Sequence, residues 1–207
     1  MKLLITLLFF IIFTISQSHS KSFVPSSFSA NYEESIYKAS MKKEVKSYGK
    51  IDYKFPGNIR YEVVTPDALL FVSNPSKSWI YSPPFDPKES GQVTIQKTSN
   101  LAITKILDSL NKGLENSKLF TTKYAGNDLS LNFTPDMQKD SSVKLMTLHA
   151  SKEAKTIQSL KEFESLSIEY VDGRKVKMKF LEMKEDVKFE SNHFVFTVPE
   201  KTKVTTN

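Results

Sequence analysis

The residues that could perform acid–base or metal chemistry are few and scattered. Residues 21–207 contain two histidines, His149 and His193, and neither has an Asp-x-His or His-x-x-x-His companion. We interpret each as a surface or strand-packing histidine, because general bases and metal ligands usually have such partners. The adjacent carboxylates Glu33-Glu34 and Glu185-Asp186 lie near lysines, which is typical of a solvated face.

Nucleophile and cofactor motifs are also missing from the sequence. There is no cysteine, which excludes a thiol nucleophile and a thiolate metal site. No Gly-x-Ser-x-Gly, phosphate loop or dinucleotide fingerprint occurs, and the chain has only six glycines. We therefore predict that the protein is not an enzyme, binds no metal and needs no cofactor.

Apolar side chains are the most distinctive chemical feature of the sequence. The chain has 15 phenylalanines, eight tyrosines and one tryptophan, together with long Leu, Ile and Val runs. Some of these residues must form the core. A cavity lined with them would suit a carrier of fatty-acyl chains, because burial of apolar area drives transfer at ~25 cal/mol per Å². Such a cavity must also release its guest, so we expect a moderate affinity.

The net charge of +6 leaves two interpretations open. The excess lysines form an ordinary solvated surface, or they attract the protein to anionic membranes or acidic partners. Nucleic acid is a poor candidate for a binding partner. Arg60 and Arg174 are the only arginines, so few side chains can form bidentate hydrogen bonds with phosphates or base edges.

Residues 1–20 predict a secretory signal peptide. Lys2 precedes an apolar run over 3–15, which at about thirteen residues is shorter than the ~20 of a membrane-spanning helix. Ser18 and Ser20 supply the small residues of a cleavage site. We expect a soluble protein of residues 21–207, large enough to fold as one domain without disulfides. No cysteine follows the signal, so it is not that of a lipid-anchored lipoprotein.

The pattern of residues 28–198 predicts short β-strands. Segments 49–53 and 58–63 alternate with period two around turn residues 55–58. Segment 68–72 is apolar on both faces, as expected of a strand covered on both sides. Further strands are expected at 79–81, 119–124, 128–133 and 145–149, and the last ones between Val187 and Val198, before Pro199.

A hairpin is predicted around Asp172-Gly173. Its apolar residues occupy even positions on both arms, 166–170 and 176–180. A two-residue loop would place the two sets on opposite faces, whereas a three-residue loop with Gly173 in the left-handed conformation aligns them. We expect the three-residue loop.

Residues 100–114 predict one amphipathic helix. Its apolar positions follow the i, i+3, i+4, i+7 spacing, with N-cap candidates at 98–100 and Gly113 near the end. Periodicity leaves open whether the helix packs on a sheet or covers a ligand cavity as a lid. Together these elements predict a curved antiparallel sheet of about ten strands in meander order, with one inserted helix.

The first half of the chain resembles the LolA family. The shared pattern has a glycine-led strand, a basic-x-Pro turn, an Arg-aromatic strand, a proline, an apolar strand ending in Val-Ser, and Leu-Trp-x-Tyr. It corresponds here to residues 49–61, 65–67, 70–73 and 79–81. The opening residues 28–32 and the closing residues 194–199 also resemble family landmarks.

The resemblance implies a mainly β fold with some α: an incomplete, unclosed antiparallel β-barrel covered by a helical lid. It further implies a monomeric periplasmic chaperone that shelters the acyl chains of outer-membrane lipoproteins. Such a carrier receives them from an ABC-type release complex in the inner membrane and delivers them to an outer-membrane acceptor.

The resemblance also implies site residues at the matching positions. Plain core packing remains open for each. The residues expected to bind acyl chains are Ile59, Tyr61, Val63, Leu70, Val72, Trp79 and Tyr81, with Leu70 and Val72 chosen over Leu69 and Phe71. The expected underside of the lid consists of Ile103, Ile106, Leu107 and Leu110.

Two departures from the family pattern affect the expected lid. The family usually has arginine directly before the turn proline, where this chain has Phe55, so Lys54 and Arg60 become the candidates for a lid latch. Family members also carry a helix before the first strand, whereas only residues 21–27 precede Phe28. We therefore expect part of the lid to be missing and the cavity to be more open.

Two further hypotheses compete with a lipoprotein carrier. One is a periplasmic carrier of other lipids, phospholipid or glycolipid, on the same fold. The other is a structural envelope protein that binds a partner through an exposed sheet face and holds no lipid. Co-purifying lipid would distinguish the first from the second.

Overall fold

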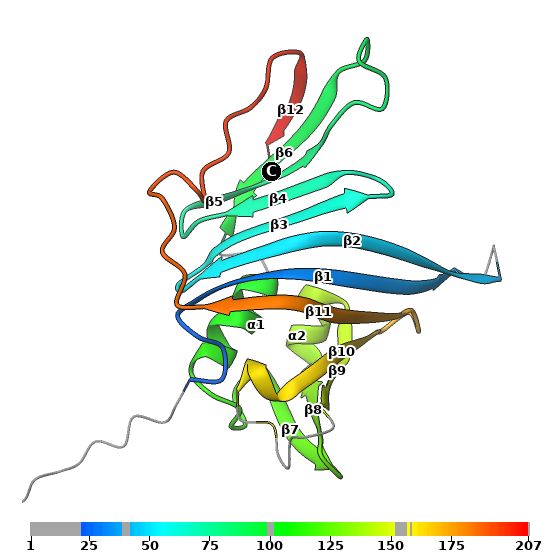
Figure 1. Cartoon of the computed structure of the whole chain (residues 1–207), viewed down its shortest axis with the longest axis vertical. Coiled ribbons are helices and arrows are strands. Elements are labelled where there is room, and N and C mark those ends of the chain that lie inside the picture. Colours follow the sequence, from blue (N-terminus) through cyan, green and yellow to red (C-terminus); the bar gives the residue numbers. More distant parts are fainter. Residues whose placement is uncertain (1–21, 39–41, 99–101, 152–156, 158, 207) are drawn as a thin grey trace, which may run out of the picture.

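The structure is a computed structural model that describes residues 22–38, 42–98, 102–151, 157 and 159–206 (Figure 1). The expected signal peptide, residues 1–20, lies outside these residues. Within the described part of the chain, no helix combines the length and apolarity needed to cross a membrane.

Twelve strands of the described chain form one continuous sheet, in the order β12-β6-β5-β4-β3-β2-β1-β11-β10-β9-β8-β7 (Figure 1). Because β12 and β7 lie at opposite edges, the sheet curves without closing. The strands are β1 (Ser27–Lys38), β2 (Lys43–Lys54), β3 (Asn58–Thr65), β4 (Leu69–Ser73), β5 (Lys77–Ser82), β6 (Gly91–Lys97), β7 (Phe120–Ala125), β8 (Asp128–Phe133), β9 (Val143–Ala150), β10 (Phe163–Tyr170), β11 (Lys175–Glu185) and β12 (Thr202–Thr206).

The sheet consists of two antiparallel meanders, β1–β6 and β7–β11, joined where β1 pairs with β11. The unclosed, mainly antiparallel sheet was predicted correctly. The simple meander was not, because β12 pairs in parallel with β6, and β1 pairs with β11, which is distant in the chain.

The hairpin between β10 and β11 confirms the predicted three-residue loop. Ile168 pairs with Val176, and Leu166 pairs with Met178, so the two even-numbered apolar sets share one face. Gly173 has a φ of 85°, and its N–H donates to the Tyr170 carbonyl at 3.0 Å. The positive φ explains why glycine occupies this position.

In the part of the chain that the structure describes, two α-helices and a 3-10 turn lie among the strands: α1 (Ala102–Asn111), α2 (Pro135–Ser141) and η3 (Leu160–Glu162). α1 falls inside the predicted range, and residues 99–101, which include two N-cap candidates, lie outside the described residues. α2 was not predicted from the sequence, because its seven residues are too few for a periodic pattern. α2 has Pro135 in its first turn, and Ser142, with a φ of 58°, caps its C-terminal end.

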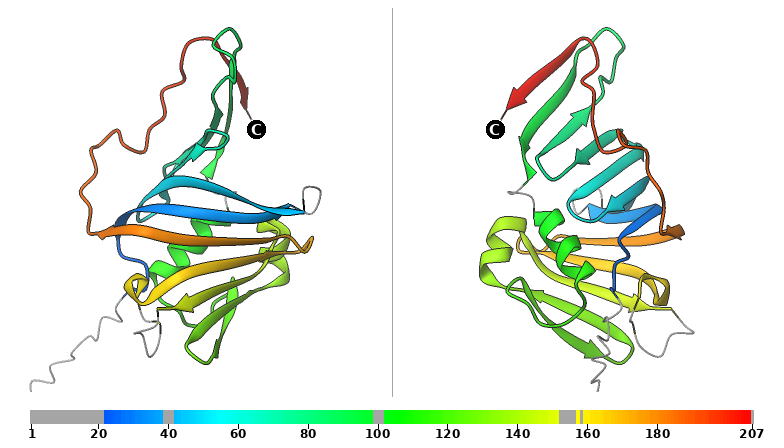
Figure 2. Two further views of the ribbon diagram at one scale, coloured as in Figure 1. Left: turned by 45° about the vertical axis from the view of Figure 1, so that its right-hand side comes forward. Right: turned by 90° about the vertical axis from the view of Figure 1, so that its left-hand side faces the viewer.

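The sheet has two distinct faces. α1 and α2 lie within its curve, whereas the C-terminal segment, residues 187–200, runs along the opposite side (Figure 2). We call these the concave and convex faces. The main core lies on the concave face beneath α1, where Tyr32, Tyr53 and Phe120 are fully buried.

Gly49 permits the close packing of β1, β2 and β3 on the concave face. A Cβ at this position would lie 1.9 Å from the Glu62 carbonyl oxygen and 2.4 Å from the Tyr32 hydroxyl. The Tyr32 side chain thus occupies the space beside its cross-strand partner Gly49. Any side chain on residue 49 would overlap backbone, which cannot move aside cheaply.

The C-terminal segment corrects the prediction of strands between Val187 and Val198. Residues 187–200 form no strand and instead cover the convex face, where Phe196 and Val198 pack on Val72, Trp79 and Val93. The alternation of Phe194, Phe196 and Val198 reflects an extended segment with one buried side rather than a strand within the sheet.

Candidate functional site

An apolar cavity of about 320 Å³ lies between the concave face and α1. This volume is at the lower end of the range typical of ligand sites. One wall comes from the first meander and includes Phe28, Ile51, Ile59, Tyr61 and Phe71. The other comes from the second meander and includes Met146, Leu148, Leu166, Ile168, Met178 and Phe180.

Six of the residues predicted from the sequence line this cavity. Ile59 and Tyr61 do so from β3, and the other four belong to α1. Ile106 and Leu110 are nearly fully buried, while Ile103 is 40% exposed at the rim. The four residues from α1 are Ile103, Ile106, Leu107 and Leu110.

Val63 lies outside this cavity, although it shares a strand face with Tyr61. It lines a second, more open hollow of about 670 Å³, which continues along the concave face toward Leu69 and residues 82–85. Glu34 lines both hollows and marks the boundary between them.

The prediction that Leu70, Val72, Trp79 and Tyr81 face the cavity was wrong. Tyr61 pairs with Phe71, so Phe71 shares the concave face and its neighbours Leu70 and Val72 point the other way. Val72 pairs with Trp79, and Leu70 pairs with Tyr81. Trp79 and Tyr81 of β5 therefore lie on the same face as Val72 and Leu70. All four belong to the convex cluster under Phe196 and Val198.

Several residues that line the cavity were not predicted from the sequence. Phe23 and Val24 precede β1, are almost fully buried and line the cavity. The even-numbered apolar residues of β10 and β11 were predicted to share one face, but nothing in the sequence indicated that this face meets β3 across a cavity.

α1 makes polar contacts with its surroundings at several points along its length. The Asp108 carboxylate accepts hydrogen bonds from the Tyr53 hydroxyl at 2.9 Å and from the Gly57 N–H at 3.1 Å. Asn111 donates to the Val24 carbonyl at 2.8 Å. The Lys105 ammonium lies 3.0 Å from the Asp140 carboxylate of α2.

The latch candidates taken from the resemblance need correction. Arg60 is paired with Asp52 and Val72 on the convex side of the sheet, away from α1. Lys54 is exposed, and no described hydrogen bond or ion pair joins either side chain to α1. The turn at residues 55–57 still meets the helix, but the helix supplies the polar group, Asp108.

Tyrosines surround the boundary between the two hollows. The Tyr32 and Tyr61 rings stack with centroids 4.9 Å apart, and the Tyr61 hydroxyl donates to Glu34 at 3.2 Å. Burial raises the pKa of Tyr61 far above its usual value, and the neighbouring Tyr32 hydroxyl and Glu34 carboxylate raise it further. Tyr61 is therefore a neutral hydrogen-bond donor at any physiological pH.

Both histidines have polar partners, which come from segments distant in the sequence. His149 Nδ1 lies 2.8 Å from Asp128, and its Nε2 lies 2.8 Å from Ser167 Oγ. Burial raises the pKa of Asp128, but hydrogen bonds from His149 and the Ala150 N–H outweigh it and lower the pKa overall.

The Ser167–His149–Asp128 arrangement has the residue types of a hydrolytic triad but stands on three regular paired strands. Ser167 pairs with Thr147 on one side and with Lys177 on the other, so it occupies no strained turn. Nucleophilic serines usually need such a turn together with free N–H groups beside it. We interpret the arrangement as a polar ladder that fixes the orientation of the His149 ring.

The second histidine fastens the C-terminal segment to the convex face. His193 Nε2 lies 2.8 Å from the buried carboxylate of Asp52, which Lys50 also approaches at 3.2 Å. The His193 ring stacks on Phe189 with centroids 4.7 Å apart. These contacts join the segment to β2.

The sheet is curved but not closed, and an apolar cavity lies between its concave face and one helix. These features define a class of unclosed-barrel proteins with an internal cavity. Within that class the chain belongs to the LolA family: residues 25–197 match the family described as outer membrane lipoprotein carrier protein LolA. The prediction of this family from the sequence is confirmed.

Named relatives and a solved structure accompany this match. The outer-membrane lipoprotein carrier protein of Francisella philomiragia subsp. philomiragia is 27% identical over 181 residues, which cover 86% of this chain and 81% of that protein. The protein of the same name from Francisella tularensis subsp. novicida is 26% identical over 180 residues, 86% of this chain and 80% of that protein. A crystal structure of a LolA superfamily protein from Nitrosomonas europaea is 13% identical, covers 86% of this chain and 94% of that chain, and has a TM-score of 0.46.

Family membership is consistent with the prediction that the chain is not an enzyme. The family is described by a carrier role, and the named relatives carry the same description.

Proposed function

We propose that this chain is a periplasmic chaperone that carries the acyl chains of lipoproteins in the cavity beneath α1. It would receive them from an inner-membrane release complex and deliver them to an outer-membrane acceptor. The observation that carries the proposal is the apolar cavity, whose described lining includes a single charged residue, Glu34. Residues 1–20 would direct the chain to the periplasm and be removed there.

The physical basis of the proposal is burial of hydrocarbon. Each methylene transferred from water into an apolar cavity contributes ~0.8 kcal/mol, so even part of an acyl chain would bind. Release requires the cavity to open, and α1 is the element most suited to move. It forms one side of the cavity, and Ile103 at its rim is already 40% exposed. We propose Ile59, Tyr61 and the four cavity-lining residues of α1 as acyl contacts.

A charge placed on the underside of α1 tests the proposal. Leu107 is half-buried and lines the cavity, so Leu107→Glu would put a carboxylate among acyl chains. Ser109→Glu adds the same charge two residues further along the helix, outside the cavity lining, and serves as the control. Each protein would be expressed in a periplasm, isolated natively and examined by mass spectrometry for bound lipid, with circular dichroism to verify folding.

The outcomes separate the competing functions. Lipoproteins bound to the parent and to Ser109→Glu, but lost from Leu107→Glu, are the expected result. Phospholipid or glycolipid alone would replace the proposal with a carrier of other lipids on the same fold. A folded parent without any lipid would contradict both carriers and leave a structural envelope role.

A further inference from the structure

The charged residues that line the two hollows have the opposite sign to the net charge of the chain. The net charge of the chain is +6. Yet the charged side chains among the described residues lining the two concave hollows are Glu34 and Asp67, both acidic. Lysines lie elsewhere: Lys177 and Lys179 flank Met178 and so face the convex side, and Lys46 pairs with Glu33. A guest in these hollows therefore meets a negative site.

Glu34 occupies the boundary between the enclosed cavity and the open hollow. It lies on β1 between Ser47 of β2 and Met178 of β11. Its carboxylate accepts a hydrogen bond from Tyr61 at 3.2 Å and forms no ion pair with any described residue. A carboxylate in this position has unused acceptor capacity, because each of its oxygens can accept more than one hydrogen bond.

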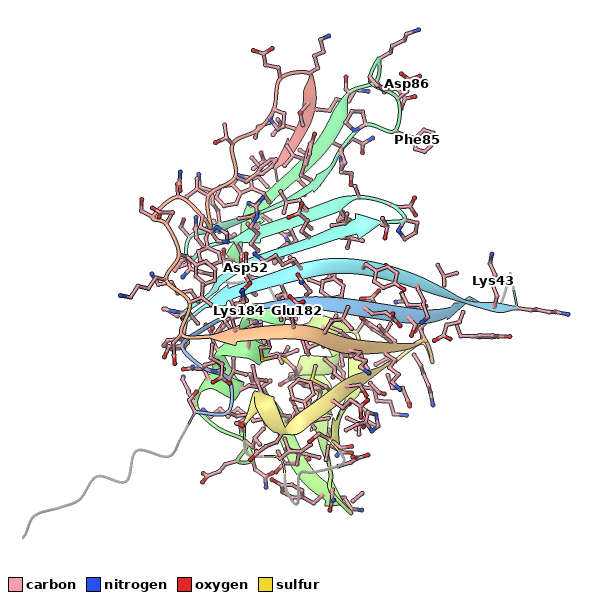
Figure 3. All side chains as sticks on the ribbon, in the orientation of Figure 1. Lys43, Asp52, Phe85, Asp86, Glu182 and Lys184 are labelled. Carbon is pink, nitrogen blue, oxygen red and sulfur yellow. The ribbon has the colours of Figure 1, made fainter. Side chains whose placement is uncertain are left out.

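The open hollow beyond Glu34 is more polar than the enclosed cavity. Its lining combines apolar residues such as Val63 and Leu69 with Ser47, Ser82 and the exposed Asp67. The loop after β5 forms its outer end, where Phe85 is fully exposed (Figure 3). The two hollows together therefore suit an amphiphile, whose apolar tail would occupy the enclosed cavity and whose polar head would occupy the more open hollow.

We propose that Glu34 binds a cationic nitrogen at the polar end of an acylated guest, with the tail under α1 and the head in the second hollow. The inference rests on the proposed function and adds the chemistry of the guest's head. A head of this kind is either the free α-ammonium of an acylated peptide or the ammonium of an ethanolamine lipid. The phosphate of the second source is disfavoured because Glu34 and Asp67 would repel it.

Simple ten-carbon amphiphiles test the charge preference. Decylammonium, 1-decanol and decanoate share one tail, and their dissociation constants at pH 7 would be measured by calorimetry below micelle formation. We expect decylammonium to bind about tenfold more tightly than 1-decanol, a difference of ~1.4 kcal/mol, and decanoate to bind more weakly than either. Glu34→Gln keeps an oxygen acceptor for Tyr61 and should remove the tenfold preference.

Glu33→Gln is the matched control, because Glu33 adjoins Glu34 but pairs with Lys46 on the opposite face. It should leave the preference intact. Equal binding of all three probes would overturn this inference and leave the acyl cavity standing. Failure of every probe to bind, decylammonium included, would instead overturn the proposed function.

A second set of ligands distinguishes the two sources of the ammonium. A diacylated cysteinyl peptide with a free amino terminus should bind more tightly than its N-acetylated form, and Glu34→Gln should abolish that difference. Lysophosphatidylethanolamine is the alternative ligand. If it alone shows a dependence on Glu34, the acylated-peptide source is excluded and the ethanolamine source stands.

Discussion

Tyr32 joins packing and electrostatics at a single residue. Its ring stacks on Tyr61, its side chain lies beside Gly49, and its hydroxyl donates to the Glu62 carbonyl at 3.1 Å. Burial raises the pKa of Tyr32 to about 12; the Tyr61 hydroxyl offsets part of the rise, and the carboxylates of Glu34 and Glu62 add to it.

The raised pKa predicts how stability responds to alkali. Because the folded state holds the Tyr32 proton more tightly than the unfolded state, this stabilisation is fully present below pH ~10 and is lost as the pH rises toward about 12. Replacing Tyr32 with Phe should therefore flatten the fall in the free energy of unfolding between pH 10 and 12, by on the order of 2 kcal/mol. Urea denaturation at a series of pH values would measure it.

Tyr37→Phe provides the comparison, because Tyr37 lies on the same strand and is 63% exposed. A Tyr32→Phe variant whose alkaline stability curve matches those of the parent and of Tyr37→Phe would show that Tyr32 does not control this pH range.

At the scale of elements, α1 covers the cavity and is joined to the sheet partly through one carboxylate. Its buried face packs on the main core, and Asp108 links it to β2 and to the 55–57 turn. Hydrogen bonds to a charged group are stronger than neutral ones. Their loss would leave the buried Tyr53 hydroxyl without its acceptor.

Removing this link should loosen the helix. Asp108→Ala is expected to cost about 2 kcal/mol of unfolding free energy and to speed amide hydrogen exchange in α1 more than in the central strands. Asp140→Asn weakens the exposed pair between Lys105 and α2 and should cost less than about 0.5 kcal/mol. Equal exchange rates of α1 in the parent and in Asp108→Ala would contradict a latch at this position.

The elements themselves were largely predictable, but the faces of some strands were not. Period-two alternation located β3 and the β10–β11 hairpin, and the helical spacing located α1, because each has one apolar and one polar side. Segment 68–72 is apolar at every position, so its pattern contains no information about which side faces which layer. The cross-strand pair Tyr61–Phe71 decides that question, and register cannot be read from a uniform apolar run.

At the scale of the whole molecule, the protein has an apolar cluster on each side of one sheet. The convex cluster contains the chain's single tryptophan, Trp79, which is 6% exposed beneath the C-terminal segment. Phe196 packs on this cluster, and the centroid of its ring lies 5.1 Å from the centroid of the Tyr81 ring. Trp79 therefore reports on the C-terminal segment rather than on the cavity.

Phe196→Ala should shift Trp79 emission to longer wavelength, because water reaches the indole when the ring is removed. The expected loss of unfolding free energy is about 2 kcal/mol, less than for a fully buried phenylalanine, since Phe196 is partly exposed. Val195→Ala, at an exposed position next to it, should leave the emission unchanged. Fluorescence and chemical denaturation measure both effects.

Filling the cavity with decylammonium supplies an independent check of the same arrangement. It should leave Trp79 emission unaltered in the parent. A shift comparable to that of Phe196→Ala would place Trp79 in contact with the guest and contradict the assignment of the two faces.

The family resemblance made the unclosed barrel predictable, whereas the covering of its convex face was not. Phe194, Phe196 and Val198 alternate as they would in a strand. Only the three-dimensional structure shows that this segment covers Trp79 instead of joining the sheet. Similarly, nothing local in β12 indicates that it pairs in parallel with β6. Contacts between segments distant in the chain leave no periodic signal in either one.

The pairing of β1 with β11 also sets the order in which the molecule can fold. Each meander pairs strands that are neighbours in the chain, whereas β1 meets β11 across roughly 150 residues, as in the pair Phe28–Glu185. Closing a loop of that length costs more entropy than forming a hairpin, so we expect this junction to form after the hairpins of each meander. The cavity walls come from both meanders, so we expect the complete cavity to exist only once the junction has formed.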